Sequence, residues 1–74
     1  MTLKEAVQQL PRTRDMLKKL QENATKLAEH CETLKYTSQA EAFRYEAAAY
    51  ANAANLMEQL IESIEKDMKG LQHG

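Results

Sequence analysis

The chain has 74 residues, a formal charge of −1 and a single cysteine, Cys31. A chain of this length forms one small domain whose core supplies no more than ~3–5 kcal/mol, and one cysteine excludes an internal disulfide or a structural zinc site. The balanced charge excludes a general attraction to polyanions, and no apolar run approaches the ~18 residues that cross a membrane. A cytoplasmic protein is expected, because an unpaired cysteine is typical of reducing compartments.

The first predicted element is a short N-terminal helix over residues 2–10. Thr2 and Glu5 match the Ser/Thr-x-x-Glu pattern, in which each side chain bonds a free backbone N–H at a helix start. Pro11 has no N–H and disfavours helical geometry at Leu10, so it either begins a new helix or kinks a continuous one. We expect a break or a kink at Pro11.

The second predicted helix covers residues 12–35, and an apolar seam at heptad spacing runs through the first two helices. Steps of three and four from the N-terminus meet one polar residue, Thr13. This spacing predicts a coiled-coil-like helix that buries one stripe. Cys31 lies on the stripe and is expected to be a small, buried and chemically inert residue. The predicted seam residues are Leu3, Ala6, Leu10, Thr13, Leu17, Leu20, Ala24, Leu27, Cys31 and Leu34.

A turn at residues 35–38 and a third helix over residues 39–70 complete the chain. Ser38 and Glu41 repeat the helix-start pattern, and Gly70 suits a helix end. The same heptad steps give a second seam: Ala40, Phe43, Ala47, Tyr50, Ala54, Met57, Ile61, Ile64, Met68 and Leu71. A short turn between two equal seams pairs them antiparallel. The expected fold is all-α, a single helical-hairpin domain over residues 1–74.

The charges of the two ends favour the same pairing. Lysine and arginine predominate in the first twenty residues, whereas Glu58, Glu62, Glu65 and Asp67 make residues 55–68 acidic. An antiparallel hairpin places these opposite charges side by side, whereas a parallel homodimer of either segment would place like charges together.

The third predicted helix has an uncharged face that we interpret as a protein interface. No charge occurs among the eleven residues from Ala47 to Met57. Alanine is a strong helix former, which alone explains part of this composition, but an uncharged circumference is typical of a helix buried on more than one side. Packing against a second copy would give a homodimeric four-helix bundle. The predicted interface residues are Ala42, Tyr45, Ala49, Asn52, Ala53, Leu56 and Leu60.

These features predict a small non-enzymatic interaction module that acts as an adaptor, regulator or inhibitor of a partner protein. Neither His30 nor His73 follows a glutamate by three residues, and no phosphate-binding loop or nucleophile with its base is present, so no catalysis, metal or cofactor is expected.

The alternative is a dimeric hairpin regulator that binds RNA or DNA through a basic cluster near Pro11. Its residues are Arg12, Arg14, Lys18, Lys19 and Lys26. The neighbouring Asp15, Glu22 and Glu29 argue against this alternative, because pairs such as Asp15–Lys19 and Glu22–Lys26 would neutralise the charges that attract phosphates.

Overall fold

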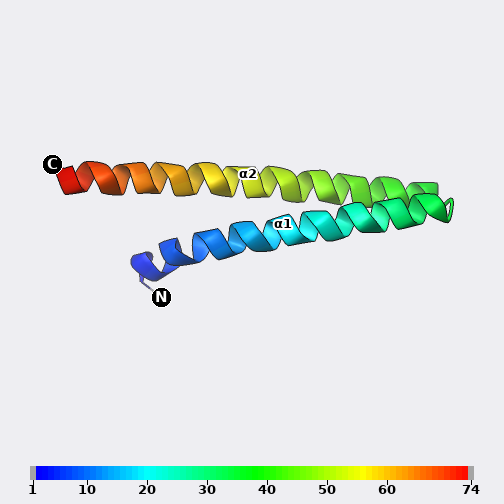
Figure 1. Ribbon diagram of the computed structural model, residues 1–74, viewed down its shortest axis with the longest axis horizontal. Helices are drawn as coiled ribbons and strands as arrows, with labels where there is room; N and C mark the ends of the chain where they lie inside the picture. Colours follow the sequence, from blue (N-terminus) through cyan, green and yellow to red (C-terminus); the bar gives the residue numbers. More distant parts are fainter. Residues whose placement is uncertain (1, 74) are drawn as a thin grey trace.

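Long stretches free of glycine, with strong helix formers at most positions, fold as two helices. The computed structural model describes the backbone of residues 2–73 and the side chains of residues 2–70. In this part of the chain α1 (Leu3–Thr33) and α2 (Thr37–His73) pack against each other. Figure 1 shows them antiparallel, close together at the turn and farther apart toward the N-terminus of α1. The predicted all-α helical hairpin is confirmed.

Helix α1 starts as predicted but does not break at Pro11. Thr2 Oγ1 accepts a hydrogen bond from the Glu5 backbone N–H at 3.2 Å, which caps the helix. The helix then continues through Pro11 to Thr33, so the separate helix predicted over residues 2–10 is wrong. Leu10 and Pro11 lie beside Ile61 and Ile64 of α2. Burial of apolar surface at this end of the hairpin offsets the one backbone hydrogen bond that the proline removes.

The turn closes α1 with a Schellman motif. The Tyr36 N–H donates to the Cys31 carbonyl at 2.8 Å and the Lys35 N–H donates to the Glu32 carbonyl at 3.0 Å. Lys35 occupies the left-handed region with φ 64°. Because this motif leaves Tyr36 immediately before α2, the helix begins at Thr37 and the helix start predicted at Ser38 is wrong.

The predicted helix end at Gly70 is also wrong, since α2 continues to His73. A glycine inside a helix costs about 1 kcal/mol relative to alanine. Gly70 comes after more than thirty residues of continuous helix. The helix at Gly70 is therefore an extension of an existing one, which needs no new nucleation.

Lys35→Gly is expected to stabilise the protein by roughly 1 kcal/mol. The left-handed conformation costs an L-residue with a Cβ about 1–2 kcal/mol, and glycine adopts it freely. Thermal unfolding followed by circular dichroism should show a midpoint higher by ~4–8 °C. Lys35→Ala is the matched control, since it removes the charge but keeps the Cβ. An equal gain from Lys35→Ala would contradict this explanation.

The interface between the helices is built mainly from small residues. The buried positions are Ala24, Ala28, Cys31, Ala40, Ala54 and Ile61. In α2 the predicted seam is confirmed from Ala40 to Ile64, because each of its positions is buried or half-buried. Met68 is 53 % exposed, and Leu71 lies outside the residues whose side chains are described. The burial of Cys31 agrees with its predicted place in the seam.

The seam predicted for α1 is correct at five of its ten positions. Ala6, Leu10, Leu17, Ala24 and Cys31 are buried or half-buried, but Leu3, Thr13, Leu20, Leu27 and Leu34 are exposed. The buried or half-buried positions that alternate with the correct ones are Val7, Arg14, Gln21 and Ala28. Ala28 has no exposed surface. Small side chains on both helices allow the axes to approach closely, which leucines in their place would prevent.

Candidate functional site

One side of the hairpin carries the ion pairs that join the two helices. Arg14 Nη1 lies 3.2 and 3.4 Å from the two carboxylate oxygens of Glu58. Nearer the turn, Arg44 pairs with Glu32. The Arg14–Glu58 pair is the contact between opposite charges that the antiparallel arrangement predicts. We call this side of the molecule the polar side.

Arg14 is held by a second carboxylate as well. Its Nε lies 3.2 Å from Asp15 Oδ1. The hydrogen bond to Asp15 raises the pKa of Arg14 above its ordinary value by more than desolvation lowers it, and the negative charge of the nearby Glu58 raises it further. Arg14 therefore stays charged and is bound to two acidic side chains within the hairpin.

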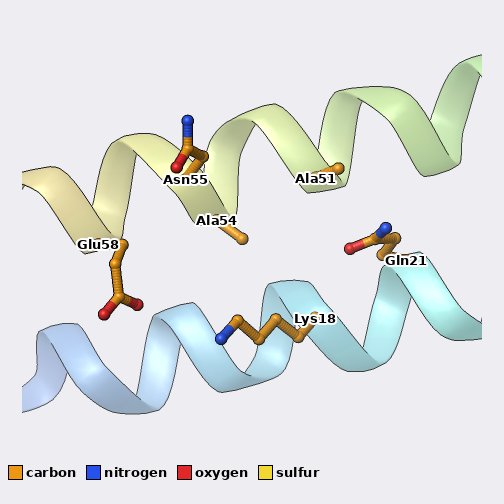
Figure 2. Close-up of a pocket in the computed structure, with 6 residues that line it drawn as sticks. All are labelled: Lys18, Gln21, Ala51, Ala54, Asn55 and Glu58. Atoms are coloured by element: carbon orange, nitrogen blue, oxygen red, sulfur yellow. The ribbon is translucent and has the colours of Figure 1, made fainter.

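The rest of the predicted basic cluster does not form one patch with Arg14. Arg12, Lys18, Lys19 and Lys26 are exposed. Lys18 lines an open groove of about 290 Å³ on the polar side, where Figure 2 shows Glu58 and Ala54 directed toward α1. Arg12, Lys19 and Lys26 recur every seven residues and so share a different strip of α1. The predicted pairs Asp15–Lys19 and Glu22–Lys26 are not among the ion pairs of the described residues.

The side opposite the ion pairs is apolar. Leu20, Leu27 and Leu34 form a column next to Ala24, on the flank away from Arg14 and Gln21. Phe43, Tyr50 and Met57 form a column next to Ala54, on the flank away from Ala51 and Glu58. In an antiparallel pair of helices, these two columns lie on the same side of the pair. The six residues therefore share one surface. We call this surface the leucine face.

The leucine face is only partly covered by the hairpin itself. Leu20, Leu27 and Leu34 are 36 %, 46 % and 48 % exposed. The three α2 residues of the face are half-buried. The sequence interpretation missed this surface because it assigned all six residues to the two seams. The sequence offered no clear signal for this surface, because Leu20, Leu27 and Leu34 form the second apolar column of a regular heptad seam, whereas the column that packs on α2 in their place contains Arg14 and Gln21.

The predicted protein interface lies on the surface of α2 that is turned away from α1. Ala53 is half-buried and its other six members are exposed. Tyr45, Leu56 and Leu60 are 77 %, 65 % and 46 % exposed. We call the seven predicted residues the outer face of α2. They carry no charge and need no rearrangement of the hairpin to meet a partner.

At the open end, where the helices diverge, an apolar groove of about 450 Å³ is lined by Leu3, Val7, Ile64 and Met68 among others.

Among the described residues, no three His, Cys, Asp or Glu side chains gather as a metal site would require. Neither helix, as far as it is described, has the apolar length that crossing a membrane demands. No protein-family model, curated protein or solved structure matches the chain.

Proposed function

We propose that the protein is a small non-enzymatic interaction module that binds another protein through the outer face of α2. The observation that carries this proposal is the exposure of large side chains within an uncharged arc: Tyr45 is 77 % and Leu56 is 65 % exposed. Single exposed apolar residues are ordinary on protein surfaces, but a continuous uncharged patch is typical of a binding site.

The chemistry of the outer face suits an apolar helix or groove of the partner. Ala42, Ala49 and Ala53 present little bulk, so a partner backbone approaches closely. Tyr45 offers a large rigid surface with a hydroxyl, and Asn52 offers an amide that both donates and accepts. This combination fits recognition of one helix face by a complementary groove or helix. Binding without chemistry is the mode of an adaptor, regulator or inhibitor.

The nucleic-acid alternative has weaker support. Arg14 is bound to Asp15 and Glu58, and the other cations are divided between different strips of α1. Affinity for RNA or DNA depends on several cations that contact neighbouring phosphates together. We therefore expect weak, nonspecific binding to nucleic acid at physiological ionic strength.

Affinity capture with immobilised protein tests the proposal. The wild type and Ala49→Glu should be compared in extracts of cells that express the protein, and any captured protein should be purified and titrated by calorimetry. A carboxylate buried in an apolar contact has no partner, so Ala49→Glu should weaken binding by at least tenfold, or about 1.4 kcal/mol.

Ala48→Glu is the matched control. It makes the same substitution at the adjacent exposed alanine, about 100° around the helix, and should leave binding unchanged. Equal affinity of Ala49→Glu and wild type for the captured protein would refute the proposed surface. Submicromolar, salt-sensitive binding to RNA or DNA would favour the alternative function instead.

A further inference from the structure

The hairpin by itself has a very thin core. Four of its six buried hydrophobic residues are alanines, and no large side chain is fully buried. Its extents of 59 × 21 × 12 Å correspond to one layer of helices. Stable domains are built from at least two packed layers, because one layer leaves its apolar surface in water. The missing layer must be supplied from outside the hairpin.

The leucine face is where a second layer fits. It runs along both helices over the part of the hairpin where Figure 1 shows them close together. The broad side of the molecule measures 59 by 21 Å, so a second hairpin of the same dimensions can lie along it. The polar side is unsuited to this role, since burial of its ion pairs would require their desolvation.

We infer that a second copy of this chain packs on the leucine face, with both turns at the same end, to form a two-fold symmetric four-helix bundle. The sequence pattern predicted self-association through the outer face of α2. Placement on the leucine face leaves most of that outer face free for the partner of the proposed function, and it does not depend on that function.

Charge complementarity selects the orientation of the second copy. The strip of α1 beyond the leucine face carries Glu5, Arg12, Lys19 and Lys26 and is basic overall, whereas the flank of α2 carries Glu46 and Asp67. With both turns at the same end, α1 of each copy lies over α2 of the other, so basic flanks meet acidic ones. With the turns at opposite ends, α1 would lie over α1 and like charges would meet.

Symmetry then fixes which residues meet. Rotation about a two-fold axis parallel to the helices does not change the position of a residue along that axis. Each residue of α1 therefore lies level with the same residues of α2 in the second copy as it does within its own hairpin. The pairs Arg14–Glu58 and Glu32–Arg44 define that register. They place Met16 at the height of the turn from Leu56 to Leu60, and His30 at the height of Glu46. Met16 and Leu60, which are 60 % and 46 % exposed, thus cover each other across the interface.

The molar mass in solution is the first test. Sedimentation equilibrium at micromolar concentration should give twice the chain mass of 8.4 kDa for the wild type. Leu27→Glu places a carboxylate on the leucine face and should give a mass of one chain or an unfolded protein. Ala48→Glu and Ala49→Glu should both retain the mass of two chains. A one-chain wild type would overturn the inference, and so would dissociation of Ala49→Glu but not of Leu27→Glu.

Disulfide crosslinking tests the orientation without destabilising the fold. In a Cys31→Ala background, the protein with both Met16→Cys and Leu60→Cys should form a covalent dimer on mild oxidation. Within one chain the two positions lie on opposite outer flanks and are too far apart to be bridged. The protein with Met16→Cys alone is the control and should stay uncrosslinked. If Met16→Cys alone forms covalent dimers, and the double variant forms no more of them than Met16→Cys does, the two copies pack with their turns at opposite ends.

Because these readouts concern self-association only, they separate the two proposals. If Ala49→Glu no longer captures the partner protein but keeps the mass of two chains, the result supports both the proposed function and the dimer. A one-chain mass for wild type, together with capture that depends on Ala49, would refute the dimer and leave the proposed function standing.

Discussion

Ile61→Ala is expected to remove most of the stability of the protein. Ile61 is 8 % exposed and is the only large aliphatic side chain among the buried residues of the described chain. Replacement of a buried isoleucine by alanine costs about 2–5 kcal/mol through lost burial and the cavity that remains. A domain of this size has only ~3–5 kcal/mol from its core. Urea unfolding followed by circular dichroism at fixed protein concentration measures the loss.

Leu56→Ala is the control for this substitution. It removes a side chain of similar size from the same helix at a position that is 65 % exposed. Its effect on the free energy of unfolding should be within about 0.5 kcal/mol, as for most surface substitutions. Equal losses from the two variants would contradict the assignment of Ile61 to the core and of Leu56 to the free outer face.

Ala28→Leu is expected to destabilise the hairpin by about 1–3 kcal/mol, although leucine is the more hydrophobic residue. Ala28 has no exposed surface, and the register set by the Glu32–Arg44 pair places it close to Ala47, which is half-buried on α2. Three additional carbon atoms at a close contact between helices force side chains out of their preferred rotamers or push the axes apart. The free energy of unfolding in urea again provides the measurement.

Ala48→Leu should change the free energy of unfolding by no more than about 0.5 kcal/mol, because Ala48 is exposed and leucine is nearly as good a helix former as alanine. A gain in stability from Ala28→Leu would mean that the helices have room to separate. It would contradict the view that small residues set their distance.

The architecture was predictable because it depends on local and periodic features. Few helix breakers and two heptad seams specify two long helices, and the short turn leaves only an antiparallel pairing. The cap formed by Thr2 was also readable, since it depends on residues within one helical turn. The continuity of α1 through Pro11 was not, because a proline in a helical pattern is compatible with either a break or a continuous helix, and packing beside Ile61 and Ile64 of α2 is not visible in the local sequence.

What the sequence by itself determined is the set of apolar columns on each helix and the antiparallel attraction between opposite charges, of which Arg14–Glu58 is the observed pair. Only the tertiary structure decided which columns of α1 face α2. Hydrophobic periodicity alone favours the leucines at positions 20, 27 and 34, but packing selects the smaller Ala28 because close approach of two helices requires small side chains at the contact. That choice leaves the leucines exposed beside Phe43, Tyr50 and Met57, and so creates a surface that the pattern of one helix does not reveal.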